Sequence, residues 1–139
     1  MNTPRFDEVK VGDELPPLTL SPITRTTLAL FAGASGDHNP VHIDIDFAKA
    51  AGMPDVFAHG MLSMAYLGRF LTYWVPQAQI LHYTVRFSAL TPVGAKLTCN
   101  GKVAEKIDSD NKRQVKLEIG VVDDNGEVKL AGEALVSLH

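Results

Sequence analysis

The stretch HGMLSMAYLGRFLTYW, from His59 to Trp74, carries apolar residues on nearly every side of a potential helix. A helix that is apolar all round is buried in a core and does not lie on a surface. Pro76 follows two residues later and ends the helix, because proline has no backbone N–H to continue the hydrogen-bond ladder. The stretch therefore predicts a central helix that must be covered on all sides.

The second half of the chain supplies the covering layer. Four segments alternate apolar and polar residues, which is typical of strands with one buried face: 81–87, 96–106, 112–122 and 127–138. Turn residues separate them at 91–94, 108–111 and 123–126, and the last turn contains Asn-Gly, a strong hairpin signal. We expect three consecutive hairpin connections and an α+β fold with an antiparallel sheet packed on the helix. A second copy of the sheet, in a dimer, would cover the far side of the helix.

The first half of the chain predicts a short strand near 15–20 and two short helices, at 26–34 and 47–51. The candidate N-caps are Thr24 or Ser21 for the first helix and Asp44 or Asp46 for the second. Gly33 and Gly36 end the first helix, and Gly52 closes the second.

Length and composition limit the class of protein. The 139 residues suggest one domain, 1–139, with a net charge of −3 and no cluster of Lys and Arg that would hold a nucleic acid. Cys99 is the single cysteine, so no intrachain disulfide forms and a reducing compartment is suitable. The N-terminus lacks the apolar core of a signal peptide, and the most apolar stretch is short for a bilayer and contains Arg69. We expect a cytoplasmic protein with no membrane partner.

Residues Ser35–His42, with the sequence SGDHNPVH, place an acidic and a basic side chain towards the two ends of a stiff turn. Asp37 and His42 are five residues apart, which is not the spacing of neighbours on one helix face. Pro40 also disfavours helical backbone at Asn39, which precedes it. The two side chains converge only through tertiary structure, where a shared water would make them an acid–base pair. Asn39 is placed to hold a neighbouring backbone group and fix the loop.

Two other interpretations of this turn stay open. Asp, Asn, Gly and Pro are common turn formers, so an ordinary turn also explains the composition. The other is a metal site, for which no recognised ligand spacing is present. Its candidate ligands are Asp37, His38, His42, Asp44 and Asp46.

His59 and Gly60 stand at the start of the central helix. A helix N-terminus presents unpaired N–H groups and partial positive charge, and glycine lets another group approach the backbone closely. The N–H of Gly60 is therefore a candidate donor to a substrate carbonyl that gains negative charge. Each residue alone also fits a packed core, Gly60 as a tight helix start and His59 as a buried, hydrogen-bonded side chain.

These residues belong to one longer pattern. Its members are Phe31, Ser35-Gly36-Asp37, Asn39-Pro40, His42, Asp44, Ala48, Gly52 and Ala58-His59-Gly60-Met61. The pattern resembles the hydratase signature of the MaoC-like family, which comprises (R)-specific enoyl-thioester hydratases and dehydratases. The likeness extends to residues 11–13 and to 85–93, and so covers nearly the whole chain.

The resemblance implies a hot-dog fold, in which an antiparallel sheet wraps a long central helix and a catalytic turn and helix segment overhangs it. It implies that water adds to C3 of a trans-2-enoyl thioester with protonation at C2, reversibly. Asp37 and His42 are then the catalytic pair, with the proton acceptor left open between them. Gly60 supplies the oxyanion N–H, and Asn39 and His59 belong to the same binding group. No metal and no cofactor is expected.

The substrate implied is a thioester of CoA or of acyl carrier protein. The assembly implied is a homodimer or a higher oligomer of dimers, with a heterodimer as the alternative. Two alternative functions remain. One is the catalytic subunit of a heterodimeric (3R)-hydroxyacyl-carrier dehydratase, which this chain fits because it holds the Asp/His pair. The other is a hot-dog acyl-CoA thioesterase, although the turn from Asp37 to His42 is not the usual thioesterase arrangement.

Overall fold

The computed structural model describes residues 3–109 and 111–139. Its helices are α1 (Arg25–Ser35), α2 (Ile45–Ala50) and α3 (Gly60–Trp74), with 3-10 turns at Phe6–Glu8, Pro40–His42 and Gln77–Gln79. Its strands are β1 (Leu18–Thr19), β2 (Ile80–Phe87), β3 (Thr98–Ser109), β4 (Lys112–Val122) and β5 (Val128–Ser137). The predicted α+β composition and the central helix are confirmed.

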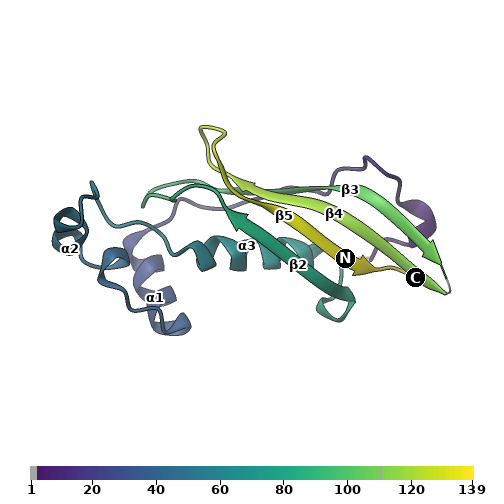
Figure 1. Ribbon diagram of the computed structural model, residues 1–139, viewed down its shortest axis with the longest axis horizontal. Helices are drawn as coiled ribbons and strands as arrows, with labels where there is room; N and C mark the ends of the chain where they lie inside the picture. The colour runs from purple at the N-terminus through teal and green to yellow at the C-terminus, as the bar shows by residue number, and fades with distance from the viewer. Residues whose placement is uncertain (1–2, 110) are drawn as a thin grey trace.

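All strands join one antiparallel sheet in the order β1-β3-β4-β5-β2 (Figure 1). The hairpins β3–β4 and β4–β5 are as predicted, although Asp110 of the first predicted turn lies outside the described residues. The predicted hairpin between the second-half strands β2 and β3 is wrong. Segment 88–97 instead leads from one edge region of the sheet to the other, and β2 pairs with β5.

Gly132 explains part of the β2–β5 pairing. It lies opposite Val85 in the register. A Cβ at this position would lie 1.9 Å from the carbonyl oxygen of Thr84, so only glycine lets the two strands approach this closely. The alternation of apolar residues identifies strands, whereas such a close approach depends on which strands become neighbours.

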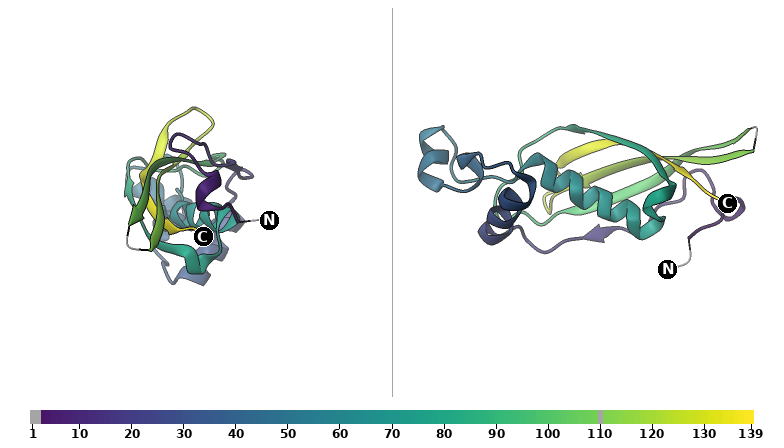
Figure 2. Two further views of the ribbon diagram at one scale, coloured as in Figure 1. Left: turned by 90° about the vertical axis from the view of Figure 1, so that its right-hand side faces the viewer. Right: turned by 90° about the horizontal axis from the view of Figure 1, so that it is seen from below.

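Helix α3 lies against the concave face of the curled sheet (Figure 2). Its buried residues are Leu62, Ser63, Leu67, Phe70 and Leu71. Burying a side chain such as leucine or phenylalanine contributes about 1.5–3 kcal/mol, so this face anchors the core. Within this chain the sheet covers one side of α3, and the far side is the one for which a second copy of the sheet is expected. A strip of α3 stays exposed, formed by Met61, Ala65, Arg69, Thr72 and Tyr73. Within 3–109 and 111–139, no helix has the length and apolar character needed to cross a membrane.

Helices α1 and α2 lie beyond the end of the sheet from which α3 begins (Figures 1 and 2). Local hydrogen bonds set their ends. The Thr24 hydroxyl accepts a bond from the Thr27 N–H, and Gly36 ends α1 with a left-handed φ of 76°. The Asp44 carboxylate caps α2, so Thr24 and Asp44 are the correct choices among the predicted caps. Gly33 lies inside α1, and of the two predicted glycines only Gly36 ends the helix.

Candidate active site

Four segments meet at the N-terminus of α3: the end of α1, the turn that follows it, the loop before α3, and the first residue of α3 itself. The turn contains Pro40–His42, a single 3-10 turn, in agreement with the stiff turn expected. Its N-cap is Asn39, whose backbone ψ of 123° is outside the helical range, as expected before a proline.

Asp37 and His42 converge in this turn. Oδ2 of Asp37 lies 3.8 Å from Nε2 of His42. That distance is too long for a direct hydrogen bond, yet one water oxygen at about 2.8 Å from both atoms satisfies both groups. The Asp37 side chain is 51% exposed and that of His42 is 9% exposed, so the pair opens to one side. The expected convergence of these two residues is present.

The partner of the other ring nitrogen decides the tautomer of His42. Nδ1 lies 2.6 Å from the backbone carbonyl oxygen of Phe57, and a carbonyl only accepts hydrogen bonds. Nδ1 therefore carries the hydrogen, and Nε2 of the neutral ring has a free lone pair facing Asp37. The Phe57 ring also packs edge-on against His42, with ring centroids 5.1 Å apart. Phe57 thus orients the imidazole and fixes which nitrogen is basic.

His59 lies behind this pair and is 1% exposed. Its Nε2 donates to the backbone carbonyl of Asp37 at 3.1 Å, and its ring stacks on His42 with centroids 3.9 Å apart. The Phe31 ring packs edge-on against it, with centroids 4.9 Å apart. Burial lowers the pKa of His59, which keeps the ring neutral, and the bond to the Asp37 carbonyl only partly opposes this shift. His59 therefore supports both members of the pair.

Asn39 acts on the backbone of the turn. Its Oδ1 accepts the N–H of Val41 at 3.2 Å, as expected for a residue that fixes the loop. Its own N–H donates to Oδ1 of Asp37 at 3.3 Å. The carboxylate of Asp37 is thereby held by one oxygen while the other faces His42.

Gly60 begins α3, and the His59 side chain does not cap this helix terminus. The first N–H groups of a helix have no intrahelical acceptor, so that of Gly60 is free to donate to another group. A Cβ on Gly60 would lie 2.9 Å from two ring carbons of Phe87. The space made by this glycine is therefore filled by Phe87, which packs directly over the start of α3.

A cavity of about 330 Å³ adjoins Gly60 on this side. Phe57, Phe87 and segment 88–91 form much of its wall. The side chain of His42 does not line it. Phe57 thus contacts both a mostly apolar cavity and, through its carbonyl, the Asp/His pair.

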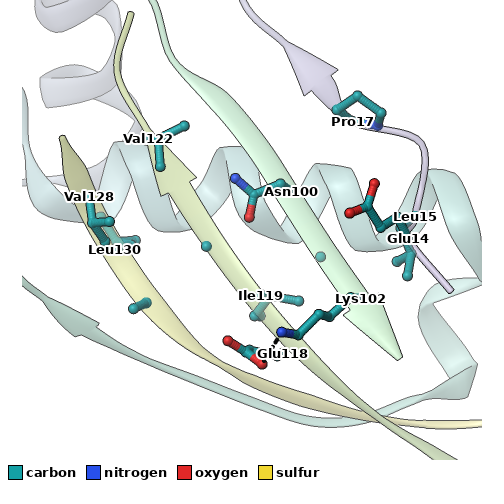
Figure 3. Close-up of a pocket in the computed structure, with 13 residues that line it drawn as sticks. Glu14, Leu15, Pro17, Asn100, Lys102, Glu118, Ile119, Val122, Val128 and Leu130 are labelled. Carbon is teal, nitrogen blue, oxygen red and sulfur yellow. Dashed lines mark ion pairs between the residues drawn. The ribbon is translucent and has the colours of Figure 1, made fainter. Parts of the chain in front are cut away.

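A larger hollow of about 490 Å³ lies elsewhere, over β3, β4 and β5 (Figure 3). In this view α3 runs behind the strands. Of the three charged residues that line the hollow, Lys102 and Glu118 pair with each other at 3.2 Å, and the third is Glu14. The hollow shares no residue with the Asp37–His42 turn, so it is not part of the candidate active site.

Three potential metal ligands come within 4.8 Å of one another: Asp37, His42 and His59. The two imidazoles stack with an interplanar angle of 27°, so their in-plane lone pairs run side by side and do not converge on one point. Each ring also uses one nitrogen on a carbonyl oxygen. Of the ligands considered from sequence, Asp44 is committed to capping α2. This arrangement favours acid–base chemistry over metal binding.

The sequence did not reveal the role of Phe57. Its contribution is mainly a backbone carbonyl, which every residue has, so no residue type marks it. The buried atoms Nδ1 of His59 and Oγ of Ser63 have no hydrogen-bond partner within the described part of the chain. Both lie at the first turn of α3, next to the residues that form the site.

Comparisons with known proteins agree with this geometry. A family model described as "MaoC like domain" matches residues 8–125. The chain is 31% identical over 107 residues to an (R)-specific enoyl-CoA hydratase of Rhodospirillum rubrum, covering 73% of each chain. It is 37% identical over 90 residues to the 3-hydroxyacyl-thioester dehydratase X of Mycobacterium tuberculosis, covering 65% of this chain and 31% of that protein.

A solved structure agrees over almost the full length. The unliganded (R)-hydratase PhaJ1 of Pseudomonas aeruginosa superposes with a TM-score of 0.85 and 31% identity, covering 97% of this chain and 86% of that one. The expected hot-dog fold is confirmed by this likeness, with α3 as its central helix. The matched region spans both the Asp37–His42 turn and the start of α3, and the chain belongs to the MaoC-like family.

Proposed function

We propose that this chain is a hydro-lyase that adds water to a trans-2-enoyl thioester. The same enzyme catalyses the reverse reaction, the dehydration of an (R)-3-hydroxyacyl thioester. Residues 1–139 act as one catalytic domain in this proposal. The observation that carries the proposal is the 3.8 Å separation between Oδ2 of Asp37 and Nε2 of His42. This separation leaves a free acceptor atom on each of the two side chains, and one water can bond to both atoms. The names of the hydratase and dehydratase relatives support the same reaction.

The tautomer of His42 supports an assignment of the proton acceptor. The carbonyl of Phe57 holds Nδ1–H, so Nε2 offers a lone pair to the water. An imidazole is intrinsically a stronger base than a carboxylate. In the proposal, an O–H bond of the water breaks, its oxygen bonds to C3 and its proton moves to Nε2 of His42. The same proton then passes from Nε2 to C2, so the reaction needs no other acid.

Asp37 then acts beside the base. Its carboxylate accepts the second O–H of the water and stabilises the imidazolium while it exists. Asn39 holds the other carboxylate oxygen through its N–H at 3.3 Å, which restricts the rotation of the Asp37 side chain.

Gly60 is proposed as the oxyanion donor. As water adds, the thioester carbonyl becomes an enolate oxygen, and a free N–H at a helix N-terminus stabilises that charge. For Asn39 and His59 we propose positioning roles in place of the substrate contacts expected from sequence. His59 is 1% exposed and its bonding nitrogen is occupied by the Asp37 carbonyl, so it reaches no ligand directly.

The substrate proposed is an acyl thioester of CoA or of acyl carrier protein, and the assembly proposed is a homodimer. Two unpaired surfaces support a dimer: the outer edge of β2, which pairs only with β5 among the described strands, and the exposed strip of α3. A different hot-dog subunit in place of the second copy would give the heterodimer.

The test is a two-channel assay with crotonyl-CoA. Loss of the enoyl absorbance without release of free thiol, with (R)-3-hydroxybutyryl-CoA as the product, supports the proposal. Thiol release at the same rate as the loss of absorbance would overturn it in favour of hydrolysis. Absence of both signals across short and long acyl thioesters of both carriers would also overturn it.

A further inference from the structure

Lys129 is a charged residue that the mechanism above does not use, and it is 2% exposed. It lies on β5, and its Nζ contacts three acceptors. These are the backbone carbonyl of Leu90 at 2.9 Å, Oδ2 of Asp123 at 3.3 Å, and a carboxylate oxygen of Glu127. A buried ammonium is costly unless it is fully paired, and here all three of its hydrogens have acceptors.

The turn between β4 and β5 orients Asp123 for this purpose. Oδ1 of Asp123 accepts the backbone N–H groups of Asn125 and Glu127, each at 2.9 Å. The bond from the Glu127 N–H and the neighbouring Lys129 charge lower the pKa of Asp123, so it stays ionised. Burial alone would lower the pKa of Lys129, but its bonds to Glu127 and Asp123 outweigh burial and raise it. The turn between β4 and β5, next to which these charged residues stand in the chain, lies at the end of the sheet where α3 begins (Figure 1).

Leu90 connects this cluster to the cavity beside Gly60. It belongs to segment 88–91, which follows β2 and forms one wall of that cavity. The segment has two further attachments: the Ser88 N–H donates to the Lys129 carbonyl at 2.9 Å, and the Ala58 N–H donates to the Thr91 carbonyl at 2.8 Å. The side chain of Leu90 is itself 55% exposed, so its packing does not hold the segment. The Lys129 ammonium is therefore the main support between these two attachments.

The second attachment leads towards the catalytic pair. Ala58 follows Phe57, whose carbonyl sets the tautomer of His42. A shift of segment 88–91 therefore changes the cavity wall first and reaches His42 only through Thr91 and the backbone of residues 57–58.

We propose that Lys129 is a positioning residue for substrate binding, which holds segment 88–91 as the wall of the thioester cavity beside Gly60. The kinetic consequence of this proposal rests on the proposed function, under which the cavity receives part of the acyl thioester. Loss of the ammonium weakens binding of the substrate more than it slows the chemical step.

The test compares Lys129→Met with Lys116→Met. Methionine keeps most of the buried length of the side chain and removes its charge. Lys116 is the matched control, because it lies on the neighbouring strand β4 and pairs with Glu133 at 2.8 Å on an exposed surface. For Lys129→Met we expect KM for crotonyl-CoA to rise about tenfold while kcat stays within about threefold, the size of effect typical for loss of a charged hydrogen-bond donor. Lys116→Met should leave both unchanged.

Hydrogen exchange of the amides in 88–91 provides a readout that does not depend on activity. It should become at least about tenfold faster in Lys129→Met and stay unchanged in Lys116→Met. If Lys129→Met does not fold, Asp123→Asn tests the same cluster with a smaller change and the same expected direction. An unchanged KM together with unchanged exchange in a folded variant would overturn the positioning role. A wild-type chain that is inactive on every thioester would overturn the proposed function, and the exchange data would still decide whether Lys129 holds the wall.

Discussion

Replacing Asp37 with asparagine removes one negative charge and almost no volume, so it tests the acid–base pair with little structural cost. Oδ1 of residue 37 still accepts the Asn39 N–H, and the backbone carbonyl of residue 37 still accepts the His59 bond. The side chain is 51% exposed, so the free energy of unfolding should change by no more than about 0.5 kcal/mol. The fold and the position of His42 should therefore be retained.

The catalytic effect should be much larger than the effect on stability. An amide neither accepts the second water proton as strongly nor stabilises an imidazolium beside it. Loss of a positioned acid–base group typically costs about 10²–10⁴ in rate, so we expect kcat to fall by that factor. At about 1.4 kcal/mol for each factor of ten, this corresponds to roughly 3–5.5 kcal/mol of transition-state stabilisation.

The assay follows the enoyl absorbance of crotonyl-CoA at equal concentrations of folded enzyme, with thermal unfolding measured on the same samples. Asp46→Asn is the matched control, because it removes an exposed carboxylate from the first turn of α2 without touching the pair. A folded Asp37→Asn variant that retains more than about a tenth of the wild-type rate would refute the assigned role of Asp37. A comparable loss in the control would show that net charge, and not the pair, governs the rate.

Three further predictions concern the strand pairing, the buried histidine and metal dependence. Gly132→Ala should lower the free energy of unfolding by at least about 2 kcal/mol in a denaturant titration, because its Cβ would overlap the Thr84 carbonyl; an unchanged midpoint contradicts this. The free energy of unfolding should fall as the pH drops below about 6.5, because the folded state lowers the pKa of His59 and the unfolded chain binds the proton more readily. His59→Gln should flatten this dependence, and an identical slope would show that His59 does not contribute. Prolonged dialysis against a chelator should leave the hydratase rate unchanged, since the stacked rings of His42 and His59 do not converge on one ion; a loss restored by a divalent metal would contradict this.

Predictions that depend on neighbouring residues agreed well with the structure. The caps of α1 and α2 are examples, because a Thr24 or Asp44 side chain bonds to an N–H two or three residues away. The central helix was recognised because its apolar residues exceed what a surface helix carries. The turn at Asn125-Gly126 was recognised for a similar reason, since the preferred backbone angles of those residues favour a hairpin.

The order of the strands could not be predicted in the same way. Alternating residues show that a segment has one buried face, but they do not show which other strand lies beside it. The pairing of β2 with β5 depends on contacts between residues about 50 positions apart, such as Val85 and Gly132. The expected hairpin at 91–94 failed because turn residues also occur in longer connections between distant strands.

For the site, the sequence alone determined which side chains are available: Asp37 and His42 in a turn that follows the glycine end of α1, and Gly60 at the start of a central helix. Only the tertiary structure decided how they work together, because the contacts that matter join segments distant in the chain. The Phe57 carbonyl determines the basic nitrogen of His42, His59 supports the turn from behind, and Lys129 reaches segment 88–91 from β5. All three contacts end on a backbone carbonyl, that of Phe57, Asp37 or Leu90, and every residue has this group, so no residue type marks it in the sequence. Lys129 resembles an ordinary charged strand residue until its burial is known.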